Sequence, residues 1–206
     1  MELKRVVVTG LGALTPLGNN VEETWKSAVE GKSGAGPITH FDASLFKTRF
    51  ACEVKDFHPE EHFDRKKLRQ LDLYAQYALV AAKEAIDDAD LDNENVDKNR
   101  VGVVFAAGIG GLHTFEEEAG YYAMNADKGP KYNPFFIPKM IGDIAAGHIS
   151  IDHGFHGPNY GTVSACASSN NAIVDAFNII RLGLADAIVA GGAEAAVFPA
   201  GVGGFN

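Results

Sequence analysis

The sequence predicts an α/β protein whose mostly parallel sheet is covered by helices. Short runs rich in β-branched residues occur at 6–9, 101–106, 159–164 and 187–191. Between them lie longer segments with the periodicity of amphipathic helices. Such alternation is typical of parallel strands, because each needs a crossover connection to reach its neighbour. The 206 residues, 46% of them hydrophobic, suffice for one sizeable core.

Two elements are expected near the N-terminus. Residues 6–9 predict a buried strand that ends at Gly10. A helix is expected over residues 21–30, since Asn20 is a good N-cap and Glu23 stands at the capping-box position. Its predicted buried residues are Val21, Trp25, Ala28 and Val29.

The middle of the chain predicts two further helices and an insertion. Asp72 is expected to cap a helix that runs to about residue 89, with a core face made of Leu73, Tyr77, Val80, Ala81 and Ala85. Residues 112–138 mix charges, aromatics and prolines, and indicate an insertion with a short helix near 113–125. A helix over 138–150 should bury Met140, Ile141, Ile144, Ala145 and Ile149.

Residues 161–183 predict a strand end, a tight turn that carries Cys166, and a long amphipathic helix. The expected buried face of this helix is Ile173, Ala176, Phe177 and Ile180. Cys166 then falls at the helix N-terminus, where free N–H groups and the helix dipole favour the thiolate, which is the nucleophilic form. A buried core cysteine is an equally good interpretation of the pattern by itself.

Bulk properties exclude several classes of protein. A net charge of −9 and a pI near 5.2 argue against a general nucleic-acid binder. Two cysteines make no disulfide framework, so the reducing cytoplasm is the simplest compartment. We expect no signal peptide, because the apolar run at residues 6–8 is broken at once by Thr9, Gly10 and Gly12. We expect no membrane span, because no apolar run approaches the required length of about 20 residues.

Two motifs resemble parts of ligand-binding sites, one for a dinucleotide and one for a metal ion, but neither motif is complete. Gly10-Leu11-Gly12 follows a predicted strand, but Thr15 replaces the third glycine of a dinucleotide-binding fingerprint. His153 and His156 have no cysteine or carboxylate cluster at ligand spacing, so no metal site is expected. Structural roles explain both motifs better.

Four motifs, in chain order, carry a family resemblance. They are RVVVTGLG at residues 5–12 with TPLG at 15–18, GIGG at 108–111, VSACASS at 163–169, and AGGAE at 190–194. Together they resemble the thiolase-fold condensing enzymes, and more narrowly the type II β-ketoacyl-acyl carrier protein synthases of bacterial fatty-acid synthesis. The resemblance covers the whole chain. It implies a thiolase-like fold in which residues 1–206 form the first of two repeats and the second is absent.

The resemblance also implies a function and a set of residues. Cys166 would accept an acyl group, and malonyl-acyl carrier protein would then condense with it to give a 3-oxoacyl thioester. Ile109 would line the acyl tunnel, Phe135 and Phe136 would reach the partner's acyl pocket in a homodimer, and Lys66 and Arg69 would dock the acidic carrier protein. Without the resemblance, core packing explains the three apolar residues, and the solvated start of a helix explains the basic pair. Gln70 departs from the family pattern at the docking site. No metal or cofactor is implied.

Part of the catalytic machinery is expected elsewhere. The resemblance places two histidines and a lysine in the second repeat, so this chain alone is expected not to condense. Two other classes remain open at this stage. One is a non-catalytic partner subunit, although such subunits generally lack the cysteine. The other is a scaffold in which Cys166 is buried.

Overall fold

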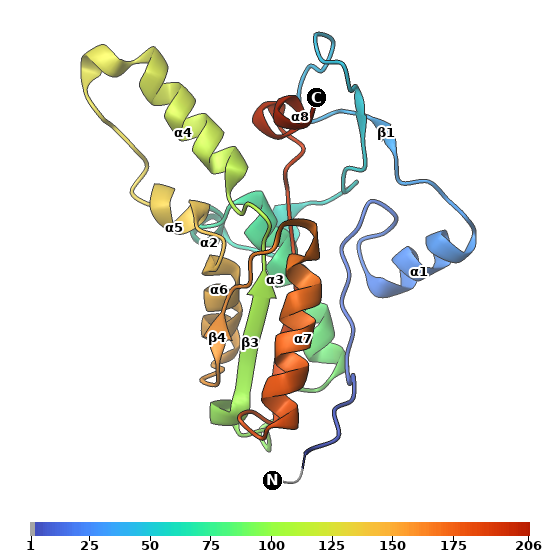
Figure 1. Cartoon of the computed structure of the whole chain (residues 1–206). Helices are drawn as coiled ribbons and strands as arrows, with labels where there is room; N and C mark the ends of the chain where they lie inside the picture. The colour runs from blue at the N-terminus through green and yellow to red at the C-terminus, as the bar shows by residue number, and fades with distance from the viewer. Residues whose placement is uncertain (1–2) are drawn as a thin grey trace. The chain divides into compact units, whose positions relative to one another are not determined.

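The computed structural model describes residues 3–206, which form two compact units (Figure 1). The first, here called the sheet unit, comprises residues 3–13, 77–109 and 142–194. The second unit comprises residues 14–76, 110–141 and 195–206. Each is described by itself.

A three-stranded parallel sheet forms the centre of the sheet unit. Its middle strand, β3 (Val101–Ala106), is buried along its whole length. On one side it pairs with the short β4 (Asn159–Tyr160), and on the other with β5 (Ala187–Gly192). The pairing of β3 with β5 is continuous, from Val101 opposite Ala187 to Ala106 opposite Gly192. The predicted parallel sheet is therefore confirmed, with β4 shorter than expected.

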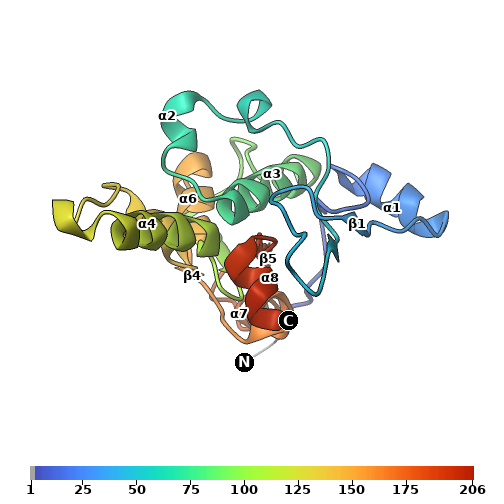
Figure 2. The same ribbon diagram turned by 90° about the horizontal axis from the view of Figure 1, so that it is seen from above.

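Helices lie on both faces of this sheet. The helix α7 (Ser168–Arg181) packs on one face, where Ala172 and Ile179 meet Val104 and Ala106. On the opposite side lie α6 (Ile144–His153) and the part of α3 (Leu73–Asp88) that belongs to the sheet unit (Figure 2). The arrangement is the layered one that alternating strands and helices predict.

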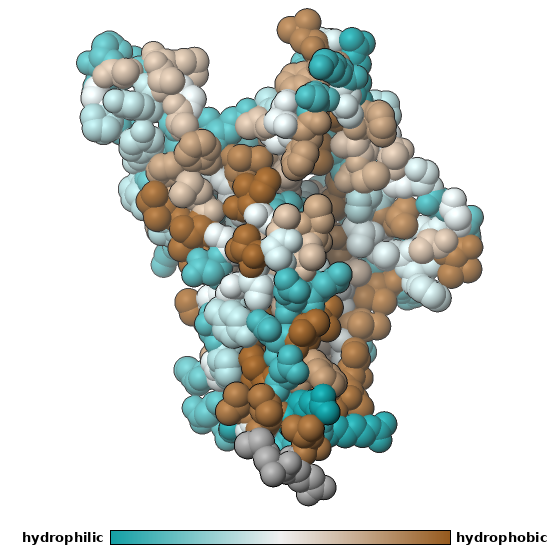
Figure 3. All heavy atoms as spheres, viewed as in Figure 1, coloured by the Kyte–Doolittle hydropathy of each residue, from teal (hydrophilic) through white to brown (hydrophobic). Residues whose placement is uncertain are grey.

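The buried face of α7 agrees with the predicted one at Ala176 and differs from it elsewhere. Ser168, Ala172 and Ala176 are buried, whereas Ile173 is 55% exposed and Phe177 is 43% exposed. Small side chains bring the helix axis close to the strands, and the bulky residues consequently point outward. Figure 3 shows apolar side chains at the surface over α7.

The predicted first strand is wrong. Residues 6–9 form no strand, and Val7 and Val8 are 57% and 79% exposed. The strands at the edges of the sheet are β4 and β5, and residues 6–9 pair with neither of them.

The N-terminal segment instead lies against α3. The N–H of Leu11 donates to Asp88 at 3.0 Å, and that of Ala13 donates to Glu84 at 2.9 Å. A Cβ at Gly12 would overlap the carbonyl oxygen of Ala81. The glycines of this segment therefore permit close backbone packing, as the structural interpretation predicts.

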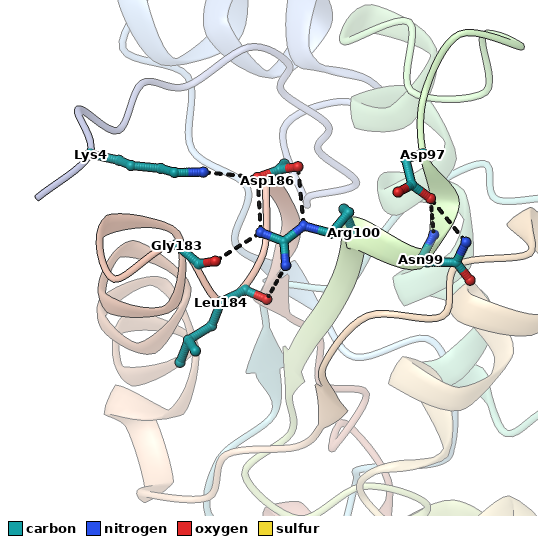
Figure 4. Close-up of polar contacts among 7 residues, drawn as sticks. All are labelled: Lys4, Asp97, Asn99, Arg100, Gly183, Leu184 and Asp186. Carbon is teal, nitrogen blue, oxygen red and sulfur yellow. Dashed lines mark hydrogen bonds and ion pairs between the residues drawn. The ribbon is translucent and has the colours of Figure 1, made fainter. Parts of the chain in front are cut away.

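An ion-pair network joins the starts of β3 and β5 (Figure 4). Arg100 donates two hydrogen bonds to the carboxylate of Asp186 and two more to the carbonyls of Gly183 and Leu184. Lys4 Nζ donates a third hydrogen bond to this carboxylate, at 3.0 Å. The hydrogen bonds from Arg100 and Lys4 lower the pKa of Asp186 to about 2. Because Asp186 is more than half exposed, this network contributes modestly to stability and chiefly fixes the strand starts.

The second unit consists of short helices joined by loops. Asp72 is buried in it and accepts hydrogen bonds from Tyr74 N–H and from both the N–H and the hydroxyl of Thr114. The predicted cap at Asp72 is thus confirmed, and it also ties α3 to α4. The remaining elements are α1 (Val21–Val29), β1 (Gly36–Pro37), β2 (Phe50–Ala51), η1 (Pro59–Glu61), α2 (Arg65–Leu68), α4 (Leu112–Met124), η3 (Ala126–Lys128), α5 (Phe136–Met140) and α8 (Pro199–Phe205). Two short helices of the sheet unit, η2 (Lys98–Arg100) and η4 (Ala165–Ala167), complete the set.

Helix positions are predicted better than their buried faces. The helix α1 has its predicted cap, because Asn20 accepts from Glu23 N–H, but none of its residues is buried and Trp25 is 69% exposed. The predicted core face of α3 is correct only at Tyr77. Its other buried residues are Tyr74, Ala75, Ala78, Leu79, Ala82 and Ile86.

The segment predicted as one helix over 138–150 forms two. The helix α5 ends at Met140 and α6 begins at Ile144. Gly142, a poor helix former, lies between them. Ala145 and Ile149 are buried as predicted, whereas Ile141 is 38% exposed.

Candidate active site

Three loops meet at the carboxyl ends of the parallel strands. One follows β3 and carries Ile109; one follows β4 and carries Cys166; the third follows β5 and carries Glu194. The N–H of Ile109 donates to Glu194 Oε2 at 2.7 Å. A Cβ placed on Gly108 would lie 2.9 Å from the same oxygen and 3.6 Å from the Ala165 carbonyl oxygen. Open parallel sheets bind their ligands at this edge.

The turn that carries Cys166 is held by the hydroxyl of Ser168, whose residue is only 4% exposed. This hydroxyl donates to the Ala165 carbonyl at 2.7 Å and accepts from Ser164 N–H at 2.8 Å. Ala165 has a φ of +51°, a left-handed conformation that L-residues adopt at a cost. The hydrogen bonds of Ser168 thus stabilise a backbone that the sequence does not favour locally.

Cys166 itself is exposed on this turn. The alternative of a buried core cysteine is therefore wrong. Within residues 3–206, the N–H of Cys166 donates no hydrogen bond to another backbone or side-chain group. The turn therefore presents a thiol together with an uncommitted backbone donor, an arrangement that suits attack on a carbonyl group.

Sequence reasoning missed several residues that shape this site. Asn171 donates to Ser164 Oγ at 2.6 Å, and the hydroxyl of Thr162 donates to the Ser168 carbonyl at 2.9 Å. The sequence could have indicated Asn171 and Thr162, because hydroxyl and amide side chains are common near the start of a helix, where they form hydrogen bonds with backbone groups. Glu194 carries no such local signal, because its partner lies 85 residues away.

The other predicted site residues lie in different places. Ile109 belongs to the sheet unit with Cys166 and is 49% exposed. Phe135 and Phe136 belong to the second unit, where the ring of Phe136 stacks on that of Tyr132 with 5.2 Å between centroids. Lys66 and Arg69 are also in the second unit, exposed on α2 and at its C-cap. The structure thus brings only Ile109 into the same unit as Cys166.

The histidine pair has a structural explanation. Nδ1 of His153 lies 2.7 Å from Asp92, whose other carboxylate oxygen binds Lys98 at 3.1 Å. In the described part of the chain, no group of three or more His, Cys, Asp or Glu side chains could hold a metal ion. Among the described helices, none has the length and apolar character to cross a membrane.

The fold and the site define an α/β domain that presents an exposed cysteine at the carboxyl edge of a parallel sheet. Residues 3–206 match the family described as "Beta-ketoacyl synthase, N-terminal domain". The chain belongs to this family, and its fold is thiolase-like.

Similar proteins support this assignment. The "3-oxoacyl-[acyl-carrier-protein] synthase 2" of Staphylococcus aureus strain COL is 46% identical over 205 residues, which are 98% of this chain and 49% of that protein. The protein of the same name from Synechocystis is 45% identical over 206 residues, again 49% of its length. The chain spans about half the length of these curated relatives.

Solved structures show the same fold. The ishigamide ketosynthase/chain length factor has a TM-score of 0.86 and 28% identity, over 98% of this chain and 50% of that one. A β-ketoacyl synthase from Burkholderia phymatum STM815 has a TM-score of 0.75 and 26% identity, over 89% of this chain and 45% of that one.

Proposed function

We propose that this chain is the nucleophile-bearing half of a condensing enzyme that elongates fatty acids on an acyl carrier protein. The observation that carries the proposal is the exposed Cys166 on a strained, hydrogen-bonded turn at the carboxyl edge of the sheet. Identity of 46% with a 3-oxoacyl-[acyl-carrier-protein] synthase, against 28% with the ishigamide ketosynthase/chain length factor, favours the reaction of the former.

The proposed reaction has two stages. The Cys166 thiolate attacks the carbonyl carbon of an acyl thioester, forming a C–S bond while the carrier's thiol leaves. Malonyl-carrier protein then loses carbon dioxide, and its carbanion attacks the acyl-enzyme carbonyl. The new C–C bond forms as the bond to Sγ breaks, which regenerates the thiolate and releases a 3-oxoacyl thioester. Covalent capture divides one difficult step into two easier ones.

The chain provides groups for the first stage. The N–H of Cys166 is the proposed oxyanion donor, because it is not committed to another acceptor within residues 3–206. The second stage needs groups that stabilise the malonyl carbanion, and the family resemblance places these in a second repeat. We therefore expect the first half-reaction, without condensation, from this chain alone.

The expectation that this chain carries out acyl transfer but not condensation can be tested with the purified 206-residue chain. Incubation with an acyl-carrier protein thioester and malonyl-carrier protein should give an acyl-protein adduct but no 3-oxoacyl product, both measured by mass spectrometry. Cys166→Ala should abolish the adduct, whereas the matched control Cys52→Ala should retain it. Acylation of the Cys166→Ala variant would contradict the proposed nucleophile, and 3-oxoacyl product from the chain alone would contradict the expectation that it does not condense.

We propose that Lys66 and Arg69 help to dock the acidic carrier protein. Both are exposed, Lys66 on α2 and Arg69 at its C-cap, in a basic run that stands out against the net charge of −9. Complementary charges at the rim of an interface mainly accelerate encounter. Changing both residues to glutamate should raise the apparent KM for the carrier-bound substrate about tenfold at low salt, and less at high salt. An unchanged KM at low salt would reject the docking role.

Ile109 is proposed to line the acyl site, since it lies half-exposed on the loop beside the Cys166 turn. Phe135 and Phe136 are proposed to contribute to an acyl pocket across a homodimer. A larger side chain at Ile109 should obstruct long acyl chains but not short ones. Ile109→Phe is therefore expected to lower the transfer of long acyl chains to Cys166 by about tenfold relative to short ones. An unchanged chain-length profile would exclude Ile109 from the site.

A further inference from the structure

We propose that Glu194 is a positioning residue that fixes the Ile109 loop against the Cys166 turn and so sets the wall of the acyl site. The inference builds on the function proposed for Cys166. Its structural basis is the single short hydrogen bond from Ile109 N–H to Glu194 Oε2, at 2.7 Å. A bond to an ionised carboxylate is among the stronger hydrogen bonds in proteins.

Glu194 lies two residues after the end of β5. The sheet pairing continues past the strand, because the N–H of the preceding residue, Ala193, donates to the Ala106 carbonyl at 3.0 Å. The backbone next to Glu194 is therefore anchored to the end of β3, and the side chain of Glu194 reaches the next loop.

The loop that it holds is rich in glycine. Ile109 is flanked by Gly108 on one side and by Gly110 on the other, and Gly110 has a φ of +84°. The loop is anchored at Gly111, whose N–H donates to the Met140 carbonyl at 3.0 Å. Glycines leave a backbone free to adopt many conformations. The bond from the Ile109 N–H consequently fixes the part of the loop that lies between Gly108 and Gly110, together with the side chain that it carries.

The absence of a side chain at Gly108 leaves the space in which the Glu194 carboxylate lies. A Cβ at Gly108 would lie 2.9 Å from Glu194 Oε2, closer than real contacts allow, and 3.6 Å from the Ala165 carbonyl oxygen. The missing side chain at Gly108 thus makes room for the carboxylate between the Ile109 loop and the Cys166 turn. Glu194 contacts the loop rather than the reacting atoms, so its proposed role is positional.

The test compares Glu194→Ala with Glu194→Gln, which keeps an acceptor oxygen, and with Glu94→Ala, an exposed control in the same unit. The first readout is amide hydrogen exchange in the peptide that covers residues 107–111. Glu194→Ala should accelerate this exchange about tenfold, whereas Glu194→Gln and the control should stay within about threefold of the parent. Exchange in β3 should be unchanged in all three, which shows that the sheet is intact.

The second readout is acyl transfer to Cys166 from short and long acyl-carrier thioesters. Glu194→Ala should change the ratio of long-chain to short-chain rates about tenfold, with rescue by Glu194→Gln. Parent-like exchange and chain-length ratio in Glu194→Ala, or failure of Glu194→Gln to rescue, would overturn the proposal. If the parent chain were not acylated at all, the proposed function would fail, while the exchange result would still decide whether Glu194 holds the loop.

Discussion

Ser168→Ala is expected to slow acyl transfer to Cys166 by about tenfold or more, the largest effect expected from a side chain that does not react. The hydroxyl of Ser168 is buried and makes two hydrogen bonds, to Ala165 and Ser164, that hold the left-handed turn. Their loss should leave the turn free to relax toward a more favourable φ at Ala165. Unfolding in urea should also show a loss of about 1–3 kcal/mol.

The rate of alkylation shows whether the Ser168→Ala change displaces the Cys166 thiol or buries it. Cys166 is exposed, so a small haloacetamide should still react with the Ser168→Ala variant at a rate within about threefold of the parent. Ser169→Ala is the matched control, since it removes the neighbouring hydroxyl, which makes neither of the two hydrogen bonds that hold the turn. Parent-like acyl transfer by Ser168→Ala, or an equal loss in Ser169→Ala, would show that the turn does not depend on this hydroxyl.

Ala172→Leu should be strongly destabilising, by about 1–3 kcal/mol. Ala172 is fully buried where α7 meets Val104 and Ala106, and the core there is closely packed. A larger side chain would push the helix from the sheet or force its neighbours from their rotamers. Urea unfolding followed by circular dichroism measures the change.

The neighbouring residue provides the control. Ile173 is 55% exposed, so Ile173→Ser should change the free energy of unfolding by no more than about 0.5 kcal/mol and should reduce self-association through the apolar surface of α7. The opposite order, with Ile173→Ser costly and Ala172→Leu tolerated, would show that α7 buries the face that its large hydrophobic residues predict.

These two residues also explain where sequence reasoning fails. Hydrophobicity ranks isoleucine and phenylalanine above alanine, so a periodicity argument places Ile173 and Phe177 in the core. The predicted Ala176 is buried, but the helix contacts the sheet through Ala172, because a small side chain permits close packing there. Periodicity can locate a helix, but it cannot tell which face its neighbours cover.

The central strand and the cysteine turn could be predicted from the sequence, because both depend on local pattern. Residues 101–106 are β-branched or apolar throughout and form a strand buried on both faces, as such runs predict. The turn at Cys166 follows from a strand that gives way to a helix. Residues 6–9 have the same composition as a buried strand yet lie outside the sheet, because composition does not specify which strands pair. The bond between Glu194 and Ile109 is likewise long-range and leaves no trace in local pattern.

The most direct test of the account is a comparison of the two cysteines in one sample. Both Cys52 and Cys166 are exposed, so accessibility alone gives them equal opportunity to react. The folded chain would be incubated with an acyl-carrier protein thioester and digested, and acyl occupancy would be measured on the two cysteine peptides by mass spectrometry. The account predicts an acyl group on Cys166 and none above background on Cys52. Equal occupancy of the two cysteines, or no acyl group on Cys166 in a chain shown to be folded, would contradict it.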